Sequence, residues 1–155
     1  MVQPATASRR AALALLLGGV STAAWAAPAA SGLTVFKTPW CGCCGVWLDR
    51  MKTAGFTKVT VVQLEDLGPT RRKLGIPDAY ASCHTAVIGG YALEGHVPPQ
   101  DVSRLLKERP AAAGLAVPGM PAGSPGMETP DGRRQPFSTM LVLKDGKAQV
   151  FARHG

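Results

Sequence analysis

Three cysteines within four residues constrain this chain more than any other feature. Cys41, Cys43 and Cys44 form three overlapping pairs (C-x-C, C-x-x-C and C-C), and the fourth cysteine of the chain follows at Cys83. A disulfide requires Cα atoms about 4.4–6.8 Å apart in a specific geometry, and adjacent cysteines reach that geometry only with strain. The spacing therefore indicates a chemical site, either a metal centre or a redox pair, rather than a set of structural disulfides.

The segments on either side of these cysteines predict how the thiols are presented. Residues 33–37 are rich in β-formers and predict a buried strand, apolar residues recur with a helical period over 45–54, and a second strand is predicted at 58–64. Cysteines that follow a strand and enter a helix meet the positive end of the helix dipole, which lowers the cysteine pKa from about 8.5 to roughly 3.5–7.5. The thiolate is both the nucleophile and the metal ligand, so this placement suits either chemistry.

The remainder of the chain predicts a mixed α/β domain with an extension. Residues 111–136 are rich in proline and glycine and predict a long loop. Beyond this loop, Asp145-Gly146 separates two apolar runs, which predicts a C-terminal β-hairpin. Residues 33–109 thus predict one α/β domain with the element order βαβαββα, and residues 110–155 predict an extension packed on it. The other predicted elements are a short helix at 65–75, strands at 85–88 and 91–95 joined by the turn Gly89-Gly90, and a helix that begins at Pro98-Pro99 and stops at Pro110.

The N-terminal residues predict export from the cytoplasm. Arg9-Arg10, a short apolar run and small residues that end in A-x-A are typical of a secretory signal over residues 1–26, and the paired arginines also permit the twin-arginine route. The apolar run is too short for a membrane span, which needs about 20 residues, so no stable membrane insertion is expected after cleavage. An uncleaved N-terminal anchor is the alternative. Residues 27–32 are expected to form a flexible lead-in.

The charge distribution argues against nucleic acid as a partner. The chain has 17 Lys and Arg residues against 10 Asp and Glu, a net charge of +7, and the loss of a signal with two arginines leaves about +5. The surplus is spread out, because only Arg71-Arg72-Lys73 and Arg133-Arg134 are clustered, and no basic stripe interleaved with aromatic residues is present. The basic balance therefore indicates a solvated surface.

The predicted element order, with the motif WCGCC at residues 40–44 between the first strand and the first helix, resembles the thioredoxin fold. The resemblance covers residues 33–109. Cys43 stands where the thioredoxin family commonly has proline, and Cys83-His84 stands where that family places a cis-proline beside its redox pair. The resemblance implies that the fold brings Cys83 and His84 beside the C-x-C-C motif.

A closer resemblance covers the whole exported part of the chain. Sequence blocks at 41–44, 82–86, 94–98 and 115–121 with 123–128 resemble the CopG-type family, periplasmic metal-binding proteins of Gram-negative bacteria that are associated with copper resistance. This resemblance implies a periplasmic location, a thioredoxin-like domain with a C-terminal extension, and copper bound at the C-x-C-C motif. It also implies copper ions and other periplasmic copper-handling proteins as partners.

The residue types agree with copper. Soft thiolate and thioether ligands select Cu(I), and the crowded motif suits bridging thiolates in a small cluster better than structural zinc, whose ligands usually form separated C-x₂₋₄-C pairs. His96 is expected to make a structural hydrogen bond, and His154, near the chain end, is expected to fray. Met120 and Met127, in the predicted loop, could supply thioether ligands or instead serve as apolar anchors for the loop. The predicted metal ligands are Cys41, Cys43, Cys44 and Cys83, with His84, Met120 and Met127 as accessory candidates.

Two functions follow from these residues. The first is a periplasmic copper-binding protein that contributes to copper resistance by sequestering Cu(I), by transferring it, or by interconverting Cu(I) and Cu(II). The second is a metal-free thiol-disulfide oxidoreductase in which Cys41 is the nucleophile and Cys44 the resolving thiol. Catalytic roles for these two cysteines are expected only if the pair is redox-active. No general acid–base pair or nucleotide motif indicates another class of enzyme.

Overall fold

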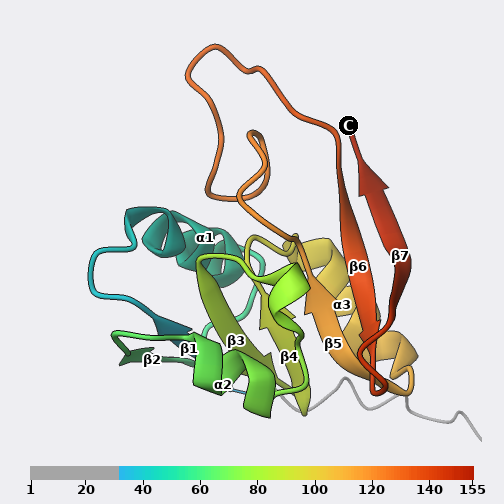
Figure 1. Ribbon diagram of the computed structural model, residues 1–155. Coiled ribbons are helices and arrows are strands. Elements are labelled where there is room, and N and C mark those ends of the chain that lie inside the picture. The colour runs from blue at the N-terminus through green and yellow to red at the C-terminus, as the bar shows by residue number, and fades with distance from the viewer. Residues whose placement is uncertain (1–31) are drawn as a thin grey trace, which may run out of the picture.

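A mixed sheet of seven strands, in the order β2-β1-β3-β4-β5-β6-β7, organises the molecule (Figure 1). The computed structural model describes residues 32–155, so the predicted signal at 1–26 and residues 27–31 of the predicted lead-in lie outside the described residues. None of the helices described is long and apolar enough to cross a membrane. In chain order the elements are β1 (Leu33–Lys37), α1 (Gly42–Thr53), β2 (Val59–Gln63), α2 (Gly68–Lys73), the 3₁₀ turn η1 (Asp78–Tyr80), β3 (His84–Ile88), β4 (Tyr91–Glu94), α3 (Pro99–Glu108), β5 (Ala112–Ala116), β6 (Phe137–Leu143) and β7 (Ala148–His154).

The strand pairing places the two cysteine-bearing segments side by side at the same end of two neighbouring strands. Strands β1 and β2 are parallel and are connected through α1, whereas β3 runs antiparallel to both β1 and β4. Lys37, the last residue of β1, pairs with His84, the first residue of β3. The segment that leaves β1 therefore lies beside the segment that enters β3.

Different helices cover the two faces of the sheet. Trp47 of α1 and Leu105 of α3 pack with Leu93 of β4 in the larger core. Ala92, the preceding residue of β4, faces a smaller cluster on the other side together with Ile76, which follows α2. This division follows from the alternation of side chains along a strand.

The mixed α/β class is confirmed, and both predicted hairpin turns are present. Gly89 and Gly90 have φ angles of +57° and +87°, which a two-residue hairpin turn of this kind requires and which glycine adopts without strain. Strands β6 and β7 pair antiparallel on either side of the Asp145-Gly146 turn. These two strands are the last two at one side of the seven-stranded sheet (Figure 1).

The predicted start of the first helix and the predicted extent of the loop were both wrong. Helix α1 begins at Gly42 rather than at residue 45, so that Cys43 and Cys44 lie in its first turn and Cys41 is its N-cap. Residues 112–116, predicted as part of the loop, form β5, which pairs parallel with β4 and antiparallel with β6. The sequence of β5 is AAGLA, which has weak β-propensity, so its pairing with two neighbouring strands determines its conformation.

The expected fraying of His154 was also wrong. His154 is the last residue of β7, and its ring stacks on Phe137 with 4.6 Å between the ring centroids. Its Nε2 lies 2.9 Å from Oδ2 of Asp101, which also accepts a hydrogen bond of 2.6 Å from the hydroxyl of Thr139. Because Asp101 belongs to the first turn of α3, this buried polar cluster attaches that helix to the C-terminal hairpin.

Candidate metal centre

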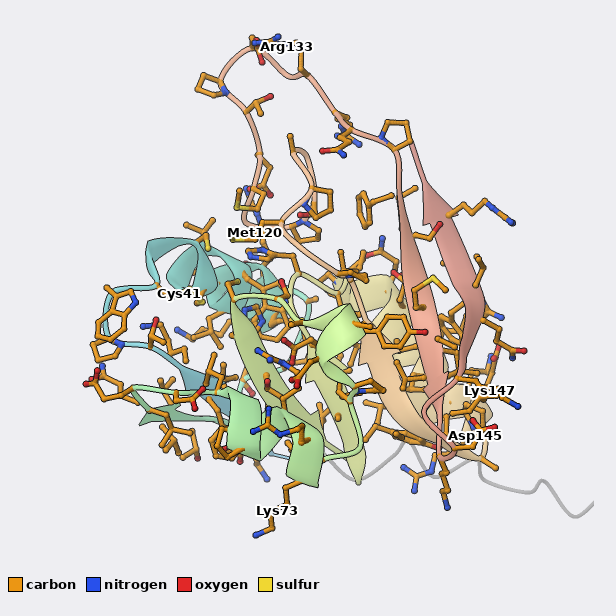
Figure 2. The ribbon with its side chains drawn as sticks, viewed as in Figure 1. Cys41, Lys73, Met120, Arg133, Asp145 and Lys147 are labelled. Carbon is orange, nitrogen blue, oxygen red and sulfur yellow. A yellow bond between two sulfur atoms is a disulfide. The ribbon has the colours of Figure 1, made fainter. Side chains whose placement is uncertain are left out.

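The fold brings the four cysteines to one place. Cys41 is the N-cap of α1, Cys43 and Cys44 lie in its first turn, and Cys83 directly precedes β3. The four sulfur atoms all lie within 4.8 Å of one another. Because β1 and β3 pair side by side, the thiols at the start of α1 face the thiol that precedes β3. Figure 2 shows Cys41 at the end of the molecule where α1 begins.

Two of the four cysteines are joined and two are free thiols. Cys41 and Cys44 form a disulfide with 5.6 Å between their Cα atoms, and Cys43 and Cys83 are unbonded. The sulfur of Cys43 lies 3.7 Å from that of Cys41, and the sulfur of Cys83 lies 3.8 Å from that of Cys44. The two free sulfurs are 3.8 Å apart. Each sulfur of the disulfide therefore faces a free thiol, and reduction adds two thiols to the same group.

Two imidazoles extend the sulfur group. Cys83, His84 and His96 form a second set of ligand atoms within 4.8 Å of one another, with Cys83 common to both sets. The sulfur of Cys83 lies 3.3 Å from Nδ1 of His84 and 3.0 Å from Nε2 of His96. Nδ1 of His96 donates a hydrogen bond of 2.7 Å to the carbonyl of Pro125, so the Nε2 of a neutral His96 carries a lone pair toward the sulfur. A backbone carbonyl orients many metal-bound histidines in the same way.

Both histidines are held in the neutral form. His84 is fully buried with its ring 4.3 Å from the ring of Trp47, and burial, followed by the nearby His96 and Lys37, lowers the pKa of His84 to about 3. Burial also lowers the pKa of His96. Among the described residues, Nε2 of His84 is a buried side-chain nitrogen without a hydrogen-bond partner. Neutral imidazole is the form that binds metals, so this donor set fits a soft metal ion.

The thiol of Cys83 is protonated when no metal is bound. Burial, reinforced by the neighbouring Cys43, raises the pKa of Cys83 to about 12. A thiol of this kind is a weak nucleophile at neutral pH, because the thiolate is the reactive form. A metal cation reverses the balance, since a thiol that coordinates a metal loses its proton. The environment of Cys83 therefore suits metal ligation better than disulfide exchange.

Three of the cysteines line an open groove of about 620 Å³. Met120 lies in the same groove on the loop that follows β5, and 51% of its surface is exposed (Figure 2). Trp40 lines the groove beside the motif and is 69% exposed. Met127, the other predicted accessory residue, is half-buried on the same loop and does not line the groove. The groove thus gives the thiols access to solvent past an exposed thioether.

The loop after β5 lies against the first turns of α1. Gly126 has a φ of +90°, and a Cβ atom at this position would lie 2.8 Å from the backbone nitrogen of Trp47 and 3.1 Å from the carbonyl oxygen of Cys43. Only glycine allows the two backbones to approach so closely. Glu128 then pairs with Arg50 of α1 at 2.9 Å. These contacts hold the Pro125 carbonyl in the position from which it orients His96.

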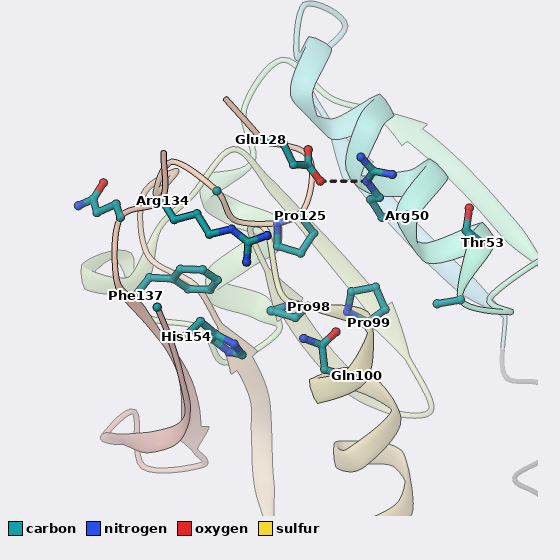
Figure 3. Close-up of a pocket in the computed structure, with 14 residues that line it drawn as sticks. Arg50, Thr53, Pro98, Pro99, Gln100, Pro125, Glu128, Arg134, Phe137 and His154 are labelled. Atoms are coloured by element: carbon teal, nitrogen blue, oxygen red, sulfur yellow. Dashed lines mark hydrogen bonds and ion pairs between the residues drawn. The ribbon is translucent and has the colours of Figure 1, made fainter. Parts of the chain in front are cut away.

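A second hollow, of about 390 Å³, lies between α1, the start of α3 and the C-terminal hairpin (Figure 3). The Arg50–Glu128 ion pair spans one side of it, and Arg134, Phe137 and His154 line the other (Figure 3). No cysteine or methionine contributes to its lining. The four cysteines and Met120 therefore lie outside this hollow.

His96 was predicted to make only a structural hydrogen bond, although the strand register indicates that it lies beside Cys83. The predicted Gly89-Gly90 turn is also the centre of the observed β3–β4 pairing, in which Thr85 is opposite Glu94. The same register, continued two residues beyond the Thr85–Glu94 pair, places His96 opposite Cys83. The structural hydrogen bond expected for His96 is present at Nδ1, while its Nε2 faces the thiol.

Comparisons with known proteins agree with this arrangement. A family model described as "Protein of unknown function, DUF411" matches residues 80–127, which include Cys83, His96 and Met120. Two solved structures of copper resistance protein CopG are similar to the chain. Form 1 is 41% identical, with a TM-score of 0.74 over 79% of this chain and 96% of that one. Form 2 is 40% identical, with a TM-score of 0.75 over 81% and 98%. No curated protein sequence matches this chain.

Proposed function

We propose, on the premise that this chain belongs to the family of the copper resistance protein CopG, that it binds copper at its four-cysteine centre and contributes to copper resistance. The observation that carries this proposal is the convergence of four sulfur atoms within 4.8 Å of one another. Sulfur ligands of this kind favour Cu(I) over harder cations. Copper is here the substrate that the protein binds and handles.

We assign the ligand roles from the contacts of each side chain. The sulfur of Cys43 contacts those of Cys41 and Cys83, so we assign its thiolate the role of a ligand shared within the centre. His96 supplies an oriented imidazole nitrogen at 3.0 Å from the sulfur of Cys83, on the buried side of the centre. Met120 supplies an exposed thioether at the groove, where an incoming Cu(I) ion first meets a soft ligand.

The redox state of the cysteines controls how many thiolates the centre offers. Opening the Cys41–Cys44 disulfide takes two electrons and two protons and yields four thiols in place of two. Each thiol that binds copper then releases its proton. The reduced protein is accordingly the copper-binding form, which can sequester Cu(I), transfer it, or take part in Cu(I)/Cu(II) conversion.

The location and the domain plan are part of the same proposal. Strand order β2-β1-β3-β4, with the first pair parallel and the others antiparallel, supports a thioredoxin-like domain over residues 33–109. The basic and apolar N-terminal segment supports a signal over residues 1–26 and export to the periplasm. A disulfide between Cys41 and Cys44 is compatible with an oxidising compartment.

A titration with Cu(I) under anaerobic conditions tests the proposed function. The fully reduced protein is expected to bind more copper per chain, and more tightly, than protein in which Cys41 and Cys44 are oxidised, because oxidation removes two of four thiolates. Copper per chain and competition with a chromophoric Cu(I) chelator measure both quantities. Equal binding by the two forms would show that Cys41 and Cys44 are not copper ligands.

A thiol-disulfide oxidoreductase remains the second candidate. The observation that favours it is the Cys41–Cys44 disulfide at the N-terminus of α1, with Cys41 lining the open groove. A disulfide in this position meets the positive end of the helix dipole, which stabilises the thiolate released on reduction. This function requires only the C-x-x-C pair, and it leaves the convergence of Cys43, Cys83 and His96 without a role.

A further inference from the structure

We propose that Glu94 is the positioning residue of the metal centre, because its carboxylate holds the segment that carries Cys83 and His84 from both ends. The inference rests on the proposed function for its meaning, since the position of Cys83 matters for copper only if Cys83 binds copper. Glu94 is itself no ligand: it is the last residue of β4, and it acts through hydrogen bonds to the neighbours of the ligands.

The two oxygens of the carboxylate contact opposite ends of one short segment. Oε1 accepts a hydrogen bond of 2.7 Å from the backbone nitrogen of Ser82, and Oε2 accepts one of 2.6 Å from the hydroxyl of Thr85. Glu94 and Thr85 are both fully buried. Between these two attachment points lie only Cys83 and His84, so the carboxylate fixes the backbone on either side of the two candidate ligands.

Arg71 completes the arrangement from α2. Its Nε donates to Oε1 of Glu94 at 2.9 Å, and its Nη2 lies 3.4 Å from the carbonyl of Ser82. The side chain of Arg71 is 10% exposed, so the ion pair with Glu94 is largely shielded from water. Burial raises the pKa of Glu94, and the hydrogen bonds from Thr85, Ser82 and Arg71 oppose that rise. The arginine thus supports the buried carboxylate, which accepts from both ends of the segment.

The position of Cys83 affects contacts with two cysteines of α1 and with His96. Its sulfur lies 3.8 Å from the sulfurs of Cys43 and Cys44 and 3.0 Å from Nε2 of His96. A shift of this one side chain changes its separation from the sulfur group and from the imidazole together. Outer residues that orient metal ligands usually contribute a factor of about 10–100 to metal affinity, and Glu94 has the contacts of such a residue.

Paired substitutions separate positioning from general stability. Glu94→Gln replaces one acceptor oxygen with an amide donor and removes the buried charge partner of Arg71, which keeps its longer ion pair of 3.4 Å with Asp78. Thr85→Val removes only the hydroxyl. The chain offers matched controls in Asp101→Asn and Thr139→Val, because Asp101 is another buried carboxylate that accepts from another fully buried threonine, in the cluster between α3 and the hairpin.

Two readouts are measured for all four variants. The first is Cu(I) affinity by chelator competition, which we expect to weaken roughly 10–100-fold for Glu94→Gln and less for Thr85→Val. The second readout needs no metal and uses oxidised protein with an added Cys43→Ser substitution, in which Cys83 is the sole free thiol among the described residues. The alkylation rate of Cys83 should rise in Glu94→Gln and in Thr85→Val. The two controls should lower the melting temperature and leave both readouts unchanged.

The outcomes distinguish the inference from the proposed function. Wild-type affinity and wild-type alkylation in Glu94→Gln and Thr85→Val would overturn the positioning role while the copper function stands. Equal changes in the Asp101 and Thr139 variants would also overturn it, because they would indicate general loosening. If wild-type protein binds no copper, the proposed function fails, and the alkylation rates still decide whether Glu94 fixes Cys83. Should Glu94→Gln not fold, Thr85→Val carries the test with a smaller expected effect.

Discussion

Replacing Cys43 with alanine is expected to abolish tight Cu(I) binding while the Cys41–Cys44 pair remains intact. The sulfur of Cys43 lies 3.7 Å from that of Cys41 and 3.8 Å from that of Cys83, so it contacts a sulfur of each cysteine-bearing segment. Its loss removes a ligand rather than an outer contact, and we expect the affinity for Cu(I) to fall by more than roughly 100-fold. Copper per chain and chelator competition on the reduced variant measure the loss.

The matched control for this substitution is Val46→Ala in the same helix. Val46 is 45% exposed and belongs to no group of ligand atoms, so its loss should leave copper binding unchanged. The Cys43→Ala variant should still form the disulfide between Cys41 and Cys44 and should still exchange it with small thiols, because both sulfurs remain. Copper binding by Cys43→Ala at the level of wild type would contradict a bridged sulfur centre and would favour the oxidoreductase.

Replacing Gly114 with alanine is expected to destabilise the fold strongly. A Cβ atom at Gly114 would lie 1.8 Å from the carbonyl oxygen and 2.6 Å from the carbonyl carbon of Ala92, in the paired strand β4. Both contacts are to backbone, so no side-chain rotation relieves them, and β5 must separate from β4. We expect a loss of about 4 kcal/mol or more, measured by chemical or thermal unfolding.

Gly45→Ala is the control for the effect of the methyl group itself. Gly45 lies in α1, and a Cβ atom there meets nothing within 4 Å. Alanine is favoured over glycine inside a helix, so this variant should be unchanged or more stable by up to about 1 kcal/mol. A Gly114→Ala variant as stable as wild type would show that β5 does not pair with β4 as closely as the structure describes.

The elements that could be predicted from the sequence are those with a local signal. The strand at 33–37, the helix after the cysteines and the turn at Gly89-Gly90 each follow from periodicity or turn chemistry within a few residues. Strand β5 lacks such a signal, because alanine and glycine favour no strand, and its conformation comes from its two neighbours in the sheet. Helix α1 begins three residues before the predicted start, because the apolar periodicity that indicates a helix begins only near Trp47.

The candidate site divides in the same way. The crowding of Cys41, Cys43 and Cys44 is visible in the sequence, and the resemblance to known families indicated that Cys83 joins them. The contacts of Glu94 with Ser82 and Arg71 join segments 12 and 23 residues apart, and no local pattern reveals such pairs. These buried polar contacts depend on the packing of β4 against α2 and the Cys83 segment, which only the folded chain defines.

One comparison on the wild-type protein tests the central claim most directly. Reduced protein is loaded with Cu(I) under anaerobic conditions, and its copper per chain and its affinity are measured beside the rate at which the metal-free protein reduces a disulfide substrate. A centre built from Cys41, Cys43, Cys44 and Cys83 predicts at least one tightly held Cu(I) per chain and slow disulfide reduction. Rapid disulfide reduction without retained copper would contradict it.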